Sequence, residues 1–207
     1  MPSVSDRGNR LALTFGPRDA GRPVANAEKA VAVAEARLTR SHAEVDAATD
    51  ILEGRTALGE GREVRALHES DVKDVKTPEF KVTGGGKPDA LAEVKAIGSD
   101  TGAVGKRAIR DNFGDAASQI SDQAARTGEK GGLVRLDGGT KPLPGTNEEM
   151  RAAIEDKWRQ SVNANPKRSG DIGWIDIVDT GPAGPRRLLL KVDGRTVTID
   201  VAGTTRP

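Results

Sequence analysis

Residues 77–95 read Thr-Pro-Glu-Phe-Lys-Val-Thr-Gly-Gly-Gly-Lys-Pro-Asp-Ala-Leu-Ala-Glu-Val-Lys, and this stretch decides the fold. Phe80 and Val82 alternate with polar residues in its first arm, as in a half-buried strand. Gly84–Gly86 supply a turn, because glycine readily adopts the backbone conformations of tight turns. Val94 is an apolar position of the second arm. The pattern therefore predicts a β-hairpin.

Two carboxylates face each other if this hairpin is centred near Gly86. Glu79 then lies opposite Glu93, with the two Cβ atoms roughly 4.5–5.5 Å apart. Facing carboxylates repel unless positive charge lies between them, and a divalent metal ion is the obvious source. Lys95 shares a face with Glu93, because side chains on a strand repeat every second residue. Two acids and a lysine are what a metal-dependent phosphodiesterase requires.

Composition restricts the chemistry of any such site. The chain has 207 residues, enough for one domain with a hydrophobic core. It has no cysteine, which excludes disulfides, thiolate metal sites and thiol nucleophiles. Its two histidines, His42 and His68, are not spaced as a zinc pair. A metal site would therefore use oxygen ligands, which favours Mg²⁺ or Mn²⁺, with Zn²⁺ as the alternative.

The overall net charge of +1 does not by itself indicate a protein that binds nucleic acid. A basic surface for that purpose would have to be a local cluster of residues. Two basic clusters could bind phosphates. One lies at the start of a predicted helix and comprises Lys106, Arg107 and Arg110, and the other lies near the C-terminus and comprises Arg186, Arg187, Lys191 and Arg195. No apolar run approaches the roughly 20 residues of a membrane span, and no signal peptide begins the chain.

The N-terminal part divides into two. Residues 1–24 are rich in Gly, Pro and Arg and are expected to form a flexible tail or linker, ahead of a domain over residues 25–207. Between Val24 and Leu58, apolar residues at spacings of three, four and seven predict a long amphipathic helix. That helix would pack on a sheet or on a partner protein.

The remaining elements alternate between strands and helices. Together with the long helix and the hairpin they predict an α/β fold, with a mixed central sheet flanked by helices. The expected elements are a strand at 63–68, a helix at 106–126, a strand at 131–136, a helix at about 148–163 capped by Thr146 or Asn147, a strand at 174–178 and a closing hairpin at 188–201.

This order of elements resembles that of PD-(D/E)XK nuclease domains. The short sequence motifs resemble those of the C-terminal toxin domains of CdiA-type contact-dependent growth inhibition proteins. The resemblance covers about residues 44–200. Its motifs are Thr77-Pro78-Glu79-Phe80, Glu93-Val94-Lys95, Gln123-Ala124-Ala125-Arg126 and Leu133-Val134. It implies a metal-dependent endonuclease toxin that cleaves tRNA, which is slightly favoured, or DNA. Such a toxin is secreted or delivered into the target-cell cytoplasm by a larger carrier and is neutralised by a cognate immunity protein.

The resemblance assigns catalytic roles to three residues. Glu93 and Lys95 form the Glu-X-Lys pair, in which the lysine would orient the attacking water or stabilise charge on the phosphorane. Gln123, or Gln119 one turn before it, would brace a ligand or contact the nucleic acid.

The metal ligands implied by the resemblance are Glu93 with one further strand acid and one helix acid. Glu79 is well placed for the strand acid but is one methylene longer than the usual aspartate. Asp89 follows Pro88 and so forms the Pro-Asp dipeptide of the family motif. However, it precedes Glu93 by four residues, which separates the two residues by roughly 13 Å on an extended strand. Spacing favours Glu79 and residue identity favours Asp89. Glu53 lies nearest the expected position of the helix acid, with Glu44 and Asp50 as rivals.

Two other functions are compatible with the same residues. The first is a non-enzymatic protein that docks a partner through the Ala-rich N-terminal helix, with the acids as a hydrophilic edge. The second is a housekeeping or mobile-element nuclease of the same fold. Aromatic residues are scarce, and Trp158 and Trp174 are expected to anchor the core, so no base-stacking surface identifies the substrate.

Overall fold

The structure, a computed structural model, describes residues 42–67, 76–97, 106–139, 142–181 and 184–204. The predicted tail and the predicted helix up to residue 41 lie outside these ranges, as does His68. The described elements are α2 (His42–Leu52), β1 (Arg62–Ala66), β2 (Phe80–Gly84), β3 (Ala90–Ala96), α3 (Lys106–Thr127), β4 (Gly132–Asp137), α4 (Asn147–Ala164), the short 3₁₀ helix η2 (Pro166–Arg168), β5 (Ile172–Gly181), β6 (Gly184–Asp193) and β7 (Thr196–Ile199).

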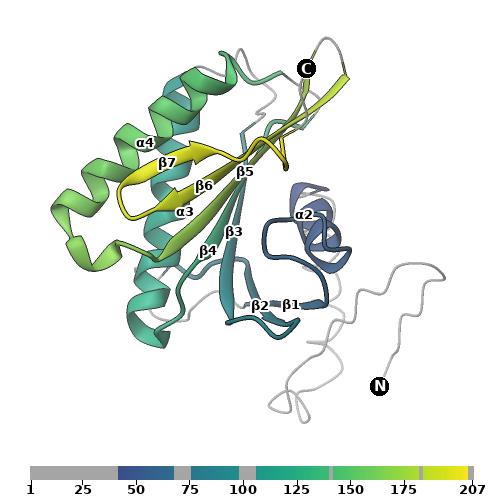
Figure 1. Ribbon diagram of the computed structural model, residues 1–207, viewed down its shortest axis with the longest axis vertical. Coiled ribbons are helices and arrows are strands. Elements are labelled where there is room, and N and C mark those ends of the chain that lie inside the picture. Colours follow the sequence, from purple (N-terminus) through teal and green to yellow (C-terminus); the bar gives the residue numbers. More distant parts are fainter. Residues whose placement is uncertain (1–41, 68–75, 98–105, 140–141, 182–183, 205–207) are drawn as a thin grey trace, which may run out of the picture.

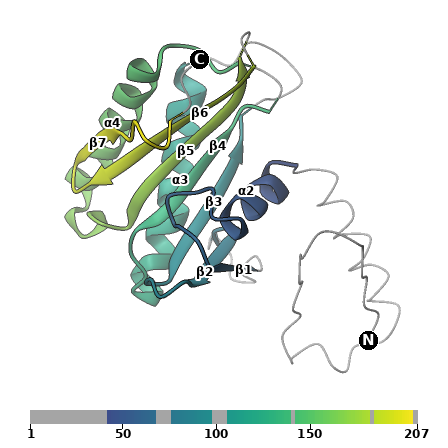
Figure 2. The ribbon, with the colours of Figure 1, turned by 45° about the vertical axis from the view of Figure 1, so that its right-hand side comes forward.

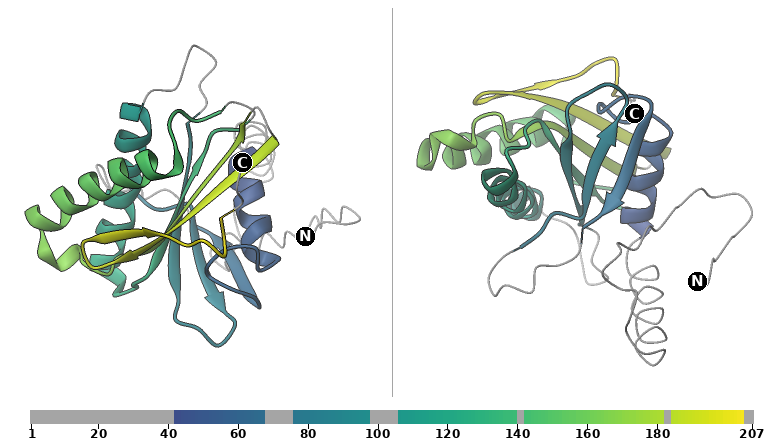
Figure 3. Two further views of the ribbon diagram at one scale, coloured as in Figure 1. Left: turned by 45° about the horizontal axis from the view of Figure 1, so that its top comes forward. Right: turned by 90° about the horizontal axis from the view of Figure 1, so that it is seen from below.

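The seven strands form one mixed sheet in the order β1-β2-β3-β4-β5-β6-β7. The β3–β4 and β4–β5 pairs are parallel, and the other neighbours are antiparallel. Parallel neighbours require a crossover, which α3 and α4 provide. Both of these helices lie on one side of the sheet and α2 lies on the other (Figures 1 and 3). The α/β class, the mixed sheet and the order of the elements agree with the sequence.

The larger core lies between the sheet and the α3–α4 pair (Figure 2). The Phe113 ring of α3 and the Trp158 ring of α4 meet edge to face, with centroids 6.4 Å apart, and both residues are fully buried. The Trp158 indole N–H donates to the carbonyl of Gly194, in the β6–β7 turn, at 2.8 Å. Trp158 thus anchors the core as predicted, whereas Trp174 is only partly buried, on the α2 side.

The smaller core lies under α2. Ala47, Ala48 and Ile51 of this helix are buried against Phe80 and Val82 of β2. The apolar stripe is therefore used inside the molecule, at least over the described part of the predicted helix.

The helix ends earlier than predicted, at Leu52 rather than Leu58. Gly54 adopts a φ of +71°, a left-handed conformation that ends many helices. Leu58 lies beyond the helix but is buried, so its apolar character reflects loop packing and not helical periodicity.

The start of α4 follows the predicted capping pattern. The Thr146 hydroxyl accepts a hydrogen bond from the backbone N–H of Glu149 at 3.2 Å. In return, the Glu149 carboxylate accepts from the backbone N–H of Thr146 at 2.8 Å. This reciprocal capping box satisfies two backbone groups that a helix end otherwise leaves unpaired.

The predicted hairpin is present, and its register is the expected one. Phe80 pairs with Ala92 and Val82 with Ala90, so one further step places Glu79 opposite Glu93. Gly84, Gly85 and Gly86 all have positive φ values, of +82°, +65° and +66°.

Arg62 of β1 stabilises this turn by hydrogen bonds. It is buried, and its guanidinium donates to the carbonyls of Gly84 and Pro88, each at 2.8 Å. A Cβ on Gly85 would lie 2.6 Å from the carbonyl oxygen of Glu60. Close backbone packing therefore makes glycine necessary at Gly85.

β5 and β6 are longer than predicted, because polar residues on them pair with one another. Arg186 makes a bidentate ion pair with Asp179, and Arg187 makes one with Asp176. These residues interrupt the apolar pattern in the sequence but not the strands. None of the helices in the described ranges has the length and apolarity to cross a membrane.

Candidate functional site

Glu93 is the centre of the candidate site. It lies in the middle of β3 with no exposed surface, on the side of the sheet that faces α3. Its Oε2 atom accepts a hydrogen bond from the backbone N–H of Glu79 at 3.0 Å. Its Oε1 atom is buried and pairs with the Lys95 ammonium, 2.5 Å away. Burial raises the pKa of the Glu93 carboxyl, even though Lys95 acts to lower it.

Lys95 lies between Glu93 and α3. Its Nζ atom, 2.5 Å from Glu93 Oε1, also donates to the Oε1 atom of Gln119 at 2.6 Å. The lysine side chain is 24% exposed, so this end of the site opens to solvent. A partly exposed ammonium held by two partners has a defined direction, which a catalytic lysine requires.

Glu79 immediately precedes β2 and is partly buried. The register sets it against Glu93, and its own backbone N–H contributes to holding the Glu93 carboxylate. In this structure, the positive charge expected beside the facing acids comes from Lys95.

Of the three helix acids, Glu44 is the one whose charge acts on Glu93, and it raises the pKa of that carboxyl. Glu53 is ion-paired with Arg55, and its side chain is 52% exposed. Asp50 is paired with Arg135 of β4, on the α2 side of the sheet. The structure therefore does not bring Glu53 to the Glu93 site, contrary to the sequence expectation.

Asp89 is also separated from Glu93. Its carboxylate lies 3.1 Å from the ammonium of Lys81, which in turn donates to Glu129 at 2.6 Å. Asp89 is 45% exposed, next to the glycine turn. β3 continues without a break from Ala90 to Ala96, so the register sets Glu79, and not Asp89, opposite Glu93.

Gln119, and not Gln123, contacts Lys95. Gln119 is buried on α3, whereas Gln123 is partly exposed and its side chain makes no hydrogen bond among the described residues. Both glutamines flank the apolar stripe of α3, one turn apart, so helical periodicity alone could not choose between them.

The carboxylates suit a divalent cation in chemistry but form an incomplete set. Carboxylate oxygens are the ligands that Mg²⁺ and Mn²⁺ prefer, and the Glu93 carboxylate is buried beside the Lys95 ammonium. Glu79 stands opposite it, and Glu44 acts on it through its charge. Within the described ranges, no three His, Cys, Asp or Glu side chains already converge closely enough to hold a metal ion. Water and substrate oxygens would have to complete the coordination, as they commonly do for Mg²⁺.

The predicted basic clusters are largely neutralised within the protein. Lys106 and Arg110 are paired with acids of α4, and Arg107 with an acid of its own helix, by the contacts Lys106–Glu149, Arg110–Asp156 and Arg107–Asp111. Arg186 and Arg187 are committed to the buried carboxylates of Asp179 and Asp176. Lys191 and Arg195 remain as exposed basic residues.

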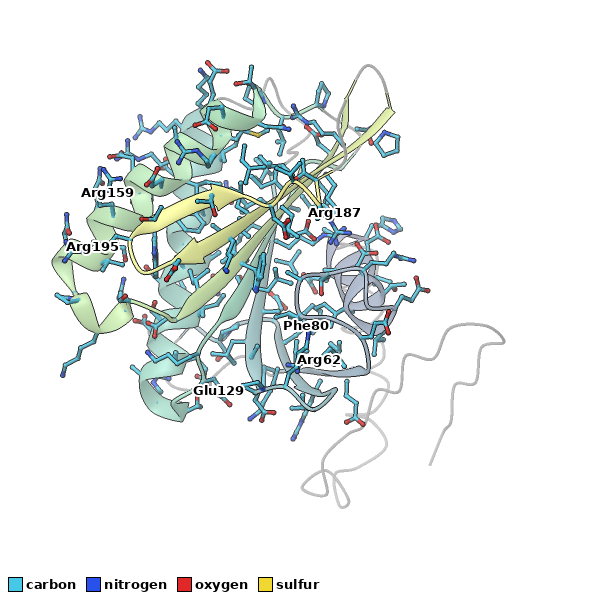
Figure 4. All side chains as sticks on the ribbon, in the orientation of Figure 1. Arg62, Phe80, Glu129, Arg159, Arg187 and Arg195 are labelled. Carbon is cyan, nitrogen blue, oxygen red and sulfur yellow. The ribbon has the colours of Figure 1, made fainter. Side chains whose placement is uncertain are left out.

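Arg135 is the main feature that sequence reasoning missed. It is 5% exposed on β4, and its guanidinium lies 2.5 Å from Asp50 of α2 and 3.6 Å from Asp176 of β5. Asp176 also accepts two hydrogen bonds from the guanidinium of Arg187, which lies on the α2 side of the sheet (Figure 4). Burial raises the pKa of Asp176, while Arg187 acts to lower it. This network ties α2 to three strands.

The comparisons with known proteins identify no family for this chain. No protein-family model and no curated protein matches this chain. Among solved structures, it is similar to the crystal structure of the central domain of yeast acetyl-CoA carboxylase, with a TM-score of 0.45 and 12% identity. That match covers 73% of this chain and 24% of the other, so the chain spans about a quarter of that protein's length. A similarity at this level supports no inference about function.

Proposed function

We propose that the protein is a divalent-metal-dependent endonuclease that hydrolyses phosphodiester bonds in nucleic acid, of the kind used as toxins in interbacterial competition. The observation that carries the proposal is the Glu93 site. A fully buried carboxylate is paired with the Lys95 ammonium at 2.5 Å and stands opposite Glu79. Burying a carboxylate is costly, and burial raises the pKa of Glu93, a kind of perturbation that concentrates at functional sites.

The order of the elements supports the same proposal. A helix, three antiparallel strands, a second helix and a strand parallel to the third occur in sequence, as the resemblance to PD-(D/E)XK nucleases implies. The Glu-X-Lys motif lies on the third of these strands and the contacting glutamine on the second helix.

Each residue has a distinct part in the proposed reaction. Glu93 and Glu79 would hold the divalent ion, and water and substrate oxygens would complete its coordination. When bound, the ion would polarise the scissile phosphate and lower the pKa of a water molecule. Lys95 would orient the attacking water or donate to the phosphorane oxygens, and Gln119 would keep the ammonium in place.

The substrate and the biological role follow from the sequence resemblance alone. On that basis we propose tRNA, with DNA as the alternative substrate. We further propose delivery into the cytoplasm of a competing bacterium by a larger carrier, and neutralisation by a cognate immunity protein. A housekeeping nuclease of the same fold would differ in being tolerated when expressed alone.

The proposal of a partner-docking helix has less support. The stripe of α2 that would dock a partner is already buried against the sheet by Ala47, Ala48 and Ile51. The remainder of the predicted helix lies outside the described residues.

A cleavage assay tests the nuclease proposal. Purified protein is incubated with tRNA and with plasmid DNA in Mg²⁺ or Mn²⁺, with and without EDTA. We expect metal-dependent cleavage that EDTA abolishes and that Lys95→Ala lowers by about 10²–10³-fold, the usual cost of removing a group that stabilises transition-state charge. Lys87→Ala is the control, because Lys87 is an exposed lysine on the turn of the same hairpin. Absence of cleavage with every metal and both substrates would contradict the proposal.

Metal binding is tested separately from activity. Thermal unfolding is followed while Mn²⁺ is added to the wild type, Glu93→Gln, Glu79→Gln and the exposed-site control Glu60→Gln. A saturating ion stabilises the folded state by about 2.7 kcal/mol at a hundred times its Kd. The wild type and Glu60→Gln should be stabilised, and the two site variants should not. Equal stabilisation of all four proteins would place the ion elsewhere.

A further inference from the structure

A groove between α3 and α4 lies apart from the Glu93 site. It has a volume of about 330 Å³, at the lower end of the range for small-molecule sites. The two helices lie side by side on the same face of the sheet (Figure 3). Gly114 and Ser118 of α3 line the groove, opposite Lys157 and Ser161 of α4, with Arg168 of η2 at one end.

Lys157 is the unusual residue of this groove. It is partly buried, yet its ammonium makes no ion pair and no hydrogen bond with any residue in the described ranges. By contrast, its neighbour Asp156 and the nearby Gln160 both interact with Arg110. Since it has no counter-charge among the described residues, this ammonium can pair with an anion that enters the groove.

Gly114 makes room for the lysine. A Cβ at this position would lie 2.3 Å from Cε of Lys157, so the lysine stem crosses α3 where a side chain is missing. Glycine in the interior of a helix is destabilising relative to alanine. The close approach of Lys157 gives this glycine a structural reason.

Arg168 adds a second cation with donors to spare. Its guanidinium donates to the Ser161 hydroxyl at 3.1 Å and to the Asp122 carboxylate at 3.3 Å. Asp122 is 53% exposed, and an ion pair so open to solvent is weak and readily rearranged. An exposed carboxylate, that of Asp115 next to Gly114, also lines the groove.

We propose that the α3–α4 groove binds a phosphate monoester. An ammonium, a guanidinium and two hydroxyls match the several acceptor oxygens and the charge of a phosphate, and a guanidinium recognises phosphate in a bidentate manner. The volume exceeds what a bare phosphate fills, so there is room for the group that carries it. A free mononucleotide and the terminal phosphate of a nucleic-acid chain both present this chemistry.

The groove is independent of the proposed nuclease site. Gln119, on the same helix, is buried and contacts Lys95 of β3, whereas Gly114 meets Lys157 of α4. Binding in the groove therefore does not require Glu93, and it can be measured whether or not the protein is a nuclease.

The test uses backbone amide NMR spectra of the full chain, at constant ionic strength and in EDTA. The probes are inorganic phosphate, adenosine 5′-monophosphate, adenosine, and a short oligonucleotide with and without a 5′-phosphate. The variants are Lys157→Met and Gly114→Ala, which keeps the lysine but fills its space. Arg159→Met is the control, since Arg159 is an exposed, ion-paired cation on the same helix (Figure 4).

We expect saturable binding of adenosine 5′-monophosphate with shifts at α3 and α4, none for adenosine, and weaker binding of inorganic phosphate. Lys157→Met and Gly114→Ala should weaken binding by about tenfold or more, the value of one charge-assisted contact, and Arg159→Met should leave it unchanged. If the oligonucleotide binds only with its 5′-phosphate, the terminal phosphate of a nucleic acid is a ligand; if it does not bind, the ligand is a free monoester. Equal binding of adenosine, no saturable binding, or equal loss in all three variants would overturn the proposal.

Discussion

The ammonium of Lys95 donates a hydrogen bond to the side-chain oxygen of Gln119 at 2.6 Å and thereby joins β3 to α3. On its other side the same ammonium meets the buried Glu93 carboxylate. The lysine is thus held in one direction by two partners. Preorganised charge of this kind accounts for much of the rate enhancement in many enzymes.

Gln119 should therefore matter for activity, and Gln123 should not. Gln119→Ala removes an acceptor from Lys95 without changing any carboxylate, and loss of such a supporting contact commonly lowers activity about 10–100-fold. Gln123→Ala, one turn along the same helix, is the matched control and should change the rate less than about twofold. The measurement is single-turnover cleavage of tRNA and plasmid DNA in Mg²⁺ or Mn²⁺. The reverse ranking of the two variants would place the contacting glutamine at Gln123.

The buried Glu93 should make the metal-free protein less stable as pH rises. Burial raises the pKa of this carboxyl above its unfolded value of 4.5, so folding favours the protonated form. Its contribution to stability is complete below about 4.5 and is lost as the pH rises through the raised folded pKa. Glu93→Gln has no titrating carboxyl at this position and therefore lacks this pH-dependent contribution to stability.

Urea unfolding in EDTA between about pH 4 and pH 7 measures this effect. The stability of Glu93→Gln relative to wild type should rise with pH, whereas the exposed-site control Glu60→Gln should show a constant difference. A difference for Glu93→Gln that falls with pH would mean that Lys95 outweighs burial.

The hairpin and its register were predictable because they depend on local rules. Three consecutive glycines locate the turn, and alternation on the strands then leaves one pairing that buries Phe80 and Val82. That pairing fixes Glu79 against Glu93 with no knowledge of the rest of the chain. The capped start of α4 at Thr146 was predictable for the same reason.

Contacts between distant elements were not predictable in this way. The pairing of Glu53 with Arg55 and of Asp50 with Arg135 depends on how α2 lies on the sheet, and neighbouring acids on a helix look alike in sequence. The Arg135 network joins residues up to 85 positions apart. Arg187 was assigned to a basic cluster that could bind phosphates, although it pairs with the buried Asp176 inside the fold.

Glycine at Gly85 should be far harder to replace than glycine at Gly86. Both have a φ near +65°, which costs a residue with a side chain about 1–2 kcal/mol. Gly85→Ala also drives a Cβ to within 2.6 Å of the Glu60 carbonyl, whereas nothing lies within 4 Å of a Cβ at Gly86. Gly85→Ala should therefore lower the free energy of unfolding by at least about 1 kcal/mol more than Gly86→Ala, measured by urea unfolding. Equal losses would mean that strand β1 yields to the added methyl group.

Arg135 should be the costliest single charge to remove. Arg135→Met leaves Asp50 without its nearest cation and removes one from beside Asp176, and breaking a buried ion pair from one side costs about 3–5 kcal/mol. Burial acts to raise the pKa of Asp50, but hydrogen bonds from Arg135 and Arg55 outweigh it and lower that pKa below 3.8. The stability that Arg135 confers through Asp50 is thus present above pH 3.8 and is lost as the pH falls through the depressed value.

Urea unfolding of Arg135→Met as a function of pH completes the argument. The deficit relative to wild type should be largest near neutral pH and should shrink in acid, because protonation neutralises the aspartates that the arginine served. Arg159→Met removes an arginine whose side chain is 56% exposed and should cost at most about 1 kcal/mol. Adding Asp50→Asn to Arg135→Met should recover part of the loss, since the unpaired carboxylate is then gone. A deficit that is independent of pH and is not relieved by Asp50→Asn would assign the role of Arg135 to packing of its stem and not to its charge.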